Sequence, residues 1–228
     1  MSYSIKQMPI SMNRPKEPFS NLKGLVIHST ANIGATAFNH FNYWNNADRQ
    51  SSVHFVVDWL GEEILQLIPE NEIAWHTGNW QGNREWLGIE MCETDSPAQF
   101  KIVWNKTVWF AADMCIRHGW NVDDNIWSHN GLRSLYAGVD HTDPYGYLTR
   151  MGKSWGELCK AIEAEIKRMK GIVPTPTINP AVVAPIDPDP DVNFIVWVRT
   201  SKAKVAKEQI NALGYACEQF PLKLSERK

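Results

Sequence analysis

Apolar runs predict strands in the first half of the chain. They cover residues 24–30, 52–59, 62–69 and 86–92, and turn-forming residues bound each one. Short apolar and β-branched runs between such boundaries are typical of buried or half-buried strands. The second and third runs are separated only by the turn around Leu60 and Gly61. We therefore expect a β-hairpin there.

Helical periodicity predicts helices over residues 34–46, 101–118 and 155–170. The last is the clearest, because Trp155, Leu158, Ile162 and Ile166 recur every three or four positions, which places them on one face of a helix. Predicted strands and helices mix along the chain. The fold class that follows is α/β, with a central mixed β-sheet flanked by helices.

Prolines divide the chain into two predicted domains. Six of them fall between Pro174 and Pro190, which predicts a semi-rigid linker over residues 173–192. We expect a larger domain over residues 1–172. Residues 193–228 read as strand, helix and strand, and predict a small C-terminal βαβ module with a net charge of +4.

Composition excludes several classes of protein. The net charge of −2 provides no basic face for nucleic acid, so we expect no nucleic-acid partner. No apolar run approaches the roughly 20 residues of a membrane helix, so we expect no membrane insertion. The N-terminal residues lack the apolar core of a signal peptide, which predicts synthesis in the cytoplasm. The four cysteines form no CxxC pair, so neither a disulfide framework nor a cysteine zinc site is indicated.

Imidazole and carboxylate groups gather in one turn-rich segment. His129, Asp140, His141 and Asp143 lie within fifteen residues, and His28 ends the apolar run at 24–30. Two histidines, one carboxylate and a water are the ligands of many hydrolytic zinc sites. Two structural alternatives remain open. His28 is on its own more typical of a satisfied core histidine, and Asp143 is equally suited to cap the turn that follows it.

A hydrolytic site also needs a proton acceptor and a group that stabilises an oxyanion. Glu90 is the candidate acceptor, since an ionised carboxylate in an otherwise apolar strand needs a metal or a hydrogen-bond partner. His141 is the candidate for stabilising the oxyanion. The alternatives are a Glu90 that simply points outward from a half-buried strand and a His141 that belongs to a surface loop.

Five segments together resemble a known enzyme family. They are VIHST, SSVHFVVDWLGEEILQLIPENEIAWHTGN, LGIEMCE, WSHNGL and DHTDPYGYL, and they span about residues 20–170. In this order and at this spacing they are similar to N-acetylmuramoyl-L-alanine amidases of the amidase-2 type. That zinc family includes phage endolysins and is related to peptidoglycan recognition proteins.

The resemblance implies roles for individual residues. It matches His28, His129 and Asp143 to the zinc ligands and Glu90 to the glutamate that serves the bound water. His141 stands where many members carry lysine, so we expect activity to fall at high pH, where a histidine is neutral. Other members carry a tyrosine at the position that Val53 occupies in this chain. Further residues of the matched segments are candidates to contact substrate: His54, His76, Trp75 and Trp80. For these, a structural role is the alternative, and His40 and His118 are expected on helix surfaces.

The function that the resemblance implies is hydrolysis of the amide between N-acetylmuramic acid and L-alanine in peptidoglycan, with Zn²⁺ as cofactor. A cytoplasmic phage endolysin that reaches the wall after release fits the N-terminal sequence, as does a bacterial recycling enzyme. A non-catalytic peptidoglycan-binding protein is the rival class, and a zinc peptidase acting on the stem peptide is a third reading. For residues 193–228, the +4 charge and small size favour wall binding or self-association.

Overall fold

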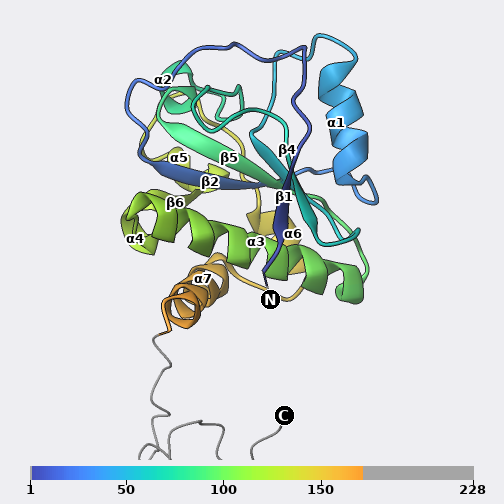
Figure 1. The fold of residues 1–228 in the computed structure, drawn as a ribbon, viewed down its shortest axis with the longest axis vertical. Coiled ribbons are helices and arrows are strands. Elements are labelled where there is room, and N and C mark those ends of the chain that lie inside the picture. Colours follow the sequence, from blue (N-terminus) through green and yellow to red (C-terminus); the bar gives the residue numbers. More distant parts are fainter. Residues whose placement is uncertain (1, 172–228) are drawn as a thin grey trace, which may run out of the picture. The chain divides into compact units, whose positions relative to one another are not determined.

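A six-stranded mixed sheet forms the centre of the computed structural model, which describes residues 2–171 (Figure 1). The strand order is β1-β4-β3-β5-β2-β6. The strands β2, β3, β5 and β6 pair in parallel, as do β1 and β4, while β3 and β4 pair antiparallel. The bounds are β1 Ser4–Gln7, β2 Gly24–Ser29, β3 Phe55–Val57, β4 Glu63–Gln66, β5 Trp86–Met91 and β6 Ile126–Ser128.

Two long helices cover one face of the sheet. They are α3, Pro97–His118, and α7, Trp155–Met169, and both lie below the sheet in Figure 1. Ser96 caps α3, Pro97 follows at its first turn, and Gly119 ends it at φ 69°, which are the usual start and stop signals. Apolar side chains of β2, β3 and β5 pack there against both helices in the larger hydrophobic core.

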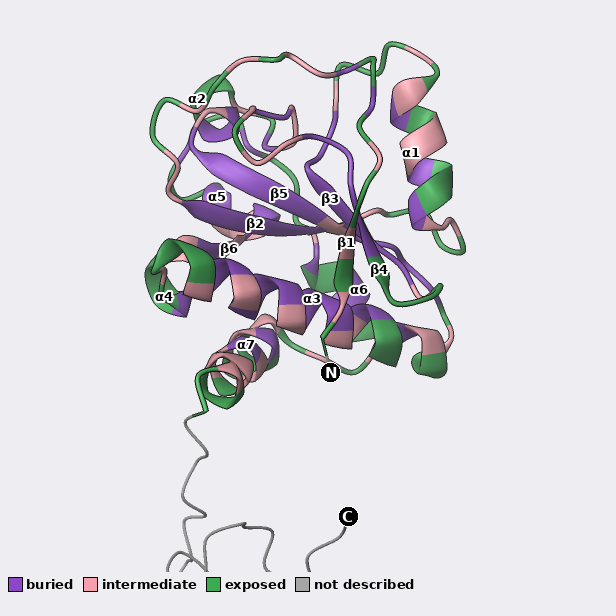
Figure 2. Cartoon of the chain, viewed as in Figure 1, coloured by how far each residue is buried: buried purple, intermediate pink, exposed green. Residues whose placement is uncertain are grey.

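The opposite face carries α1, Ala37–Asn45, together with short helices and long loops. Thr36 and Asn39 form a capping box at the start of α1, which satisfies two otherwise free backbone donors. Of the short helices, α2 Trp80–Asn83 and α5 His129–Leu132 lie on this face. The other two, α4 Val122–Asn125 and α6 Tyr145–Arg150, contribute Val122, Tyr147 and Leu148 to the larger core with α3 and α7. Figure 2 shows that β2 and β5 are buried along almost their whole length. Polar side chains at their ends are therefore held in a rigid, dry surrounding.

The sequence predicted the α/β class and the central strands correctly. The hairpin around Gly61 joins β3 to β4, and α1, α3 and α7 lie within three or four residues of the predicted bounds. The edge strands β1 and β6 were not predicted, because they have only four and three residues and show no long alternation. Within residues 2–171, no helix is long and apolar enough to cross a membrane. The predicted linker and C-terminal module, 173–228, lie outside the described residues.

Candidate metal centre

Three donor side chains meet at the carboxyl ends of two neighbouring parallel strands. His28 is the fifth residue of β2, and His129 begins α5 directly after β6. Asp143 approaches from the loop before α6, where its carbonyl oxygen accepts a hydrogen bond from the backbone N–H of Asn130. In open α/β sheets this edge is the usual place for a ligand site. Segments more than a hundred residues apart thus supply one centre.

The three side chains are close and mostly buried. Nδ1 of His28 lies 3.0 Å from Nδ1 of His129 and 3.1 Å from Oδ2 of Asp143. Nδ1 of His129 lies 3.1 Å from Oδ1 of Asp143. The two imidazoles are buried, and the carboxylate is half-buried. Asp143 does not act as a helix cap, since α6 begins without a side-chain cap.

Hydrogen bonds to backbone carbonyls fix the tautomers of His129 and His76, and His76 in turn fixes that of His28. Nε2 of His129 lies 3.1 Å from the carbonyl oxygen of Thr77, and Nε2 of His76 lies 2.9 Å from that of Trp86. A carbonyl only accepts, so both Nε2 atoms carry the proton. Nδ1 of neutral His76 then accepts from Nε2 of His28, 2.9 Å away. In their neutral forms His28 and His129 therefore both direct an Nδ1 lone pair at the carboxylate of Asp143.

Such a convergence of acceptors fits a cation. Two lone pairs and a carboxylate without a proton between them repel one another unless a positive charge lies among them. Burial lowers the pKa of His28, which favours the neutral imidazole. Two neutral imidazoles and one carboxylate are donors suited to zinc.

Glu90 lies beside this centre on the neighbouring strand. It pairs in register with His28 across β5 and β2, so both side chains point to the same face of the sheet. Its Oε2 is buried and has no hydrogen-bond partner. Burial, followed by the negative charges of Asp143 and Glu93, raises the pKa of Glu90 well above that of an ordinary carboxyl. A carboxylate poised in this way is suited to accept a proton.

His141 lies at the mouth of the centre. Its ring stacks on that of His129 with centroids 4.7 Å apart, and its Nδ1 lies 3.6 Å from Oδ1 of Asp143. The side chain is 65% exposed, so it is free to face a ligand over the metal centre.

The other predicted residues fall in two groups. His54 and His76 lie behind the candidate ligands, where His76 contacts His28. Nδ1 of His54 accepts a hydrogen bond from the backbone N–H of Gly88, and its Nε2 lies 2.9 Å from the carbonyl oxygen of Glu72. Trp75 and Trp80 lie outside this layer. Trp75 is half-buried, whereas Trp80 is 54% exposed and packs against the guanidinium of Arg84.

A cavity of about 420 Å³ opens beside Glu90, between α1 and the loop after β2. Its lining includes Thr30, Asn39, Tyr43 and Ser51, as well as His40. His40 was expected on a helix surface, and that expectation is wrong, because the side chain is only 7% exposed. It shares the inward face of α1 with Ala37 and Trp44. The spacing i, i+3, i+7 of these three residues is the signal that identifies the inward face.

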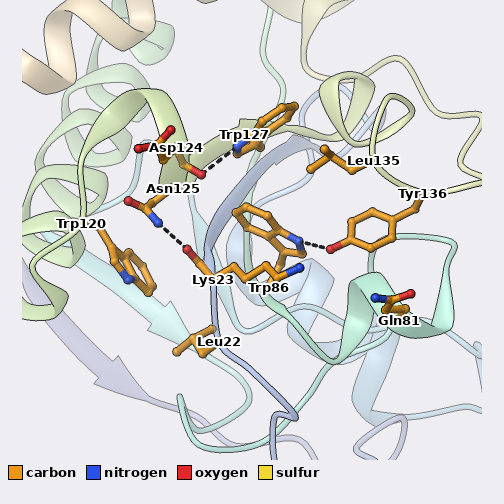
Figure 3. A pocket seen from close by; sticks show the side chains of 10 residues that line it. All are labelled: Leu22, Lys23, Gln81, Trp86, Trp120, Asp124, Asn125, Trp127, Leu135 and Tyr136. Atoms are coloured by element: carbon orange, nitrogen blue, oxygen red, sulfur yellow. Dashed lines mark hydrogen bonds between the residues drawn. The ribbon is translucent and has the colours of Figure 1, made fainter.

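A second hollow of about 560 Å³ lies at the amino ends of the same strands. Figure 3 shows Trp86 between Trp127 and Tyr136, with Trp120 on the other side of Lys23. Its polar groups pair with one another. Trp86 Nε1 donates to the hydroxyl of Tyr136 at 2.8 Å, and the ammonium of Lys23 lies 2.7 Å from Glu85.

An α/β sheet that holds two buried imidazoles and a half-buried carboxylate beside the carboxyl group of Glu90 is typical of metal-dependent hydrolases. A family model described as N-acetylmuramoyl-L-alanine amidase matches residues 18–146. The chain belongs to this family.

Three similar proteins illustrate the relationship. The N-acetylmuramoyl-L-alanine amidase CwlA of Bacillus subtilis is 34% identical over 151 residues, which cover 64% of this chain and 51% of CwlA. The Staphylococcus aureus hydrolase AmiA, solved in complex with its ligand, superimposes with a TM-score of 0.69 at 25% identity, over 76% of this chain and 88% of AmiA. A mutant endolysin from Bacillus subtilis superimposes with a TM-score of 0.56 at 28% identity, over 71% of this chain and 99% of the endolysin. The chain thus spans about half the length of CwlA.

Proposed function

We propose that the protein is a zinc-dependent amidase that hydrolyses the bond between the lactyl group of N-acetylmuramic acid and L-alanine in peptidoglycan. The observation that carries the proposal is the convergence of the two Nδ1 atoms of His28 and His129 with the carboxylate of Asp143. Membership of the amidase family supports the choice of bond. All three donor positions are filled, which favours an enzyme over a non-catalytic binding protein.

The chemistry divides among a few side chains. His28, His129 and Asp143 would hold zinc, which supplies a Lewis acid for the scissile carbonyl and lowers the pKa of a water. Glu90 accepts a proton from the attacking water and passes it to the leaving amine of L-alanine. His141, exposed at the mouth of the centre, stabilises the developing oxyanion when it is protonated. The carbonyl of Thr77 keeps His129 in the required tautomer, and the carbonyl of Trp86 does so for His28 through His76.

Digestion of purified cell walls tests metal and bond together. Walls are incubated with the full chain, with chelator-treated protein and with that protein after zinc is restored, and products are identified by mass spectrometry. We expect zinc-restorable release of L-alanine amino termini, with a free lactyl acid left on the glycan. Cleavage within the stem peptide would point to a peptidase. No cleavage of several wall types by folded, zinc-loaded protein would contradict the proposal and favour a recognition protein.

We also propose that the protein works as an endolysin, made in the cytoplasm and acting on the wall after release. The similarity to a Bacillus subtilis endolysin, at 28% identity, supports this role; CwlA is 34% identical. The full chain is produced inside a Bacillus cell, and turbidity is followed before and after a membrane-permeabilising agent is added. Lysis only after permeabilisation is expected. Wall cleavage in intact cells would contradict retention in the cytoplasm.

A further inference from the structure

Glu93 is a buried carboxylate that follows β5, three residues after Glu90, and its side chain is only 5% exposed. One carboxylate oxygen, Oε1, accepts from the hydroxyl of Ser29 at 2.8 Å and from the backbone N–H of Ala31 at 3.2 Å. The other, Oε2, accepts from the guanidinium of Arg150 at 2.6 Å. A buried carboxylate requires such partners. The chemistry of the proposed amidase does not use Glu93, so these three partners indicate what it does.

Glu93 holds the loop that follows His28. Besides the side-chain contacts, its backbone N–H donates to the hydroxyl of Thr30 at 3.2 Å, and its carbonyl oxygen accepts from the N–H of Gly34 at 2.8 Å. Ala31 has a φ of 48°, in the left-handed region that is unfavourable for a residue with a Cβ. The hydrogen bond from its N–H to Glu93 stabilises that conformation. One residue thus fixes both ends of the turn after β2.

Ser29 connects this carboxylate to the metal centre. Its hydroxyl donates to Glu93, while its backbone N–H lies 3.4 Å from Oδ2 of Asp143. Ser29 also follows His28 directly in the chain. Hydrogen bonds of this kind orient the carboxylates and imidazoles that bind a metal. The side chain of Glu93 therefore fixes a residue that contacts one candidate ligand and adjoins another.

Arg150 connects the same carboxylate to the segment that carries Asp143. It is the last residue of α6, which begins two residues after Asp143. Its guanidinium bonds to Glu93 and packs over the ring of Tyr147, 5.1 Å from the centroid. The hydroxyl of Tyr147 donates to the carbonyl oxygen of Cys92 at 3.2 Å. Helix α6 is thereby fastened to the chain that follows β5.

We propose that Glu93, through its pair with Arg150, is a positioning residue for the metal centre. It joins the segments that follow His28, Glu90 and Asp143, and so keeps the candidate ligands on one ion. Glu93 is not one of the three donors, which means that it acts through Ser29 and α6. This inference rests on the proposed function, because it assigns Glu93 a part in holding the proposed zinc.

Substitutions of the arginine test this role against a matched ion pair elsewhere. Arg150→Gln removes the guanidinium, and Arg150→Lys keeps a positive charge beside Glu93. The control is Arg117→Gln, in the last turn of α3. The two arginine side chains are 38% and 39% exposed, and each pairs with two carboxylates. Zinc affinity of each full chain is measured by competition with a chromophoric chelator, and the urea midpoint is measured on the metal-free protein.

We expect Arg150→Gln to weaken zinc affinity about tenfold, the lower end of what residues behind metal ligands contribute. Arg150→Lys should stay within about threefold of the parent. The control should stay within about twofold, although its urea midpoint falls because it too loses an ion pair. An unchanged zinc affinity in Arg150→Gln would overturn the inference, as would an equal loss in the control.

Glu93→Gln supplies a second, independent route to the same result. The amide oxygen still accepts from Ser29 and Ala31, but the charge that pairs with Arg150 is gone. Its zinc affinity should fall about as far as that of Arg150→Gln, and the double variant should fall no further, because both substitutions break one link. Additive losses would contradict that link. The proposed function fails separately, if the unsubstituted chain binds no zinc or cleaves no muramoyl amide in the wall digestion.

Discussion

The two ends of the parallel strands differ in how their polar groups are satisfied. At the amino ends, the larger hollow is lined by groups that bond to one another: Asn125 donates to the carbonyl oxygen of Lys23 at 2.7 Å, and Trp127 donates to that of Asp124 at 3.0 Å. At the carboxyl ends, three acceptors converge without a proton between them, and Oε2 of Glu90 has no partner.

The difference shows that size alone does not mark a functional site. The hollow among the tryptophans has the larger volume, about 560 Å³ against 420 Å³, but most of its polar groups already have protein partners. The carboxyl ends instead hold three converging acceptors and a carboxyl oxygen without a hydrogen-bond partner, an arrangement that a bound cation would stabilise.

The largest effect is expected for Glu90→Gln. The substitution keeps the shape and removes the proton acceptor, so kcat should fall about 10²- to 10⁴-fold, the usual contribution of general acid–base catalysis. Zinc content and the unfolding midpoint should stay close to those of the parent, because Glu90 is not one of the three donors. Steady-state kinetics on a soluble muramoyl peptide, with metal analysis, measures both. Full activity in a zinc-loaded variant would show that another group accepts the proton.

The next effect concerns stability at low pH, and it arises from His54. Burial lowers its pKa to about 4, although the hydrogen bond to the carbonyl oxygen of Glu72 opposes this. Above about pH 6.5 the imidazole is neutral in both states. As the pH falls from there to about 4, the unfolded chain binds a proton that the folded one excludes, so the free energy of unfolding decreases by up to about 3 kcal/mol.

His54→Asn removes this titration and retains an acceptor for the N–H of Gly88. We expect the variant to be less stable near pH 8, because the carbonyl of Glu72 loses its donor. Its stability should nevertheless depend less on pH between about 6.5 and 4. Urea unfolding of both proteins with a chelator present isolates the difference, since all other titrating groups are shared. If the free energy of unfolding changed with pH in the same way in both proteins over this range, the assignment of the titration to His54 would be wrong.

His76→Ala addresses the orientation of a ligand rather than the ligand itself. The imidazole accepts from Nε2 of His28 and thereby directs the Nδ1 lone pair of His28 at the centre. Partners of this kind typically contribute about 10- to 100-fold in metal affinity. Competition with a chromophoric zinc chelator should show a loss of that size, with the fold intact by circular dichroism. His76→Asn, whose amide oxygen lies about where Nδ1 of the imidazole lies and can accept the same bond, should lose less.

The sequence identified the three candidate ligands, but it did not show which residues position them. His28, His129 and Asp143 belong to motifs whose resemblance to a family is specific, and the structure brings them together. The hydrogen bonds of His54 and His76 depend on which backbone carbonyls the fold places beside them, and no local pattern encodes that. One signal was present. Gly88 interrupts an apolar strand, and a Cβ there would lie 2.7 Å from Nδ1 of His76, so the glycine makes room for that ring.

The smallest effect is expected at the tryptophan end. Leu135 borders the larger hollow and is 47% exposed, so Leu135→Ala removes apolar wall with little loss of packing. If this hollow binds no substrate, kcat/KM should stay within about twofold of the parent on both whole walls and a soluble muramoyl peptide. A selective loss on whole walls would show that the hollow binds a second glycan strand through its aromatic faces. Paired polar groups at the amino ends of the strands would then not distinguish a hollow without a ligand from a binding site.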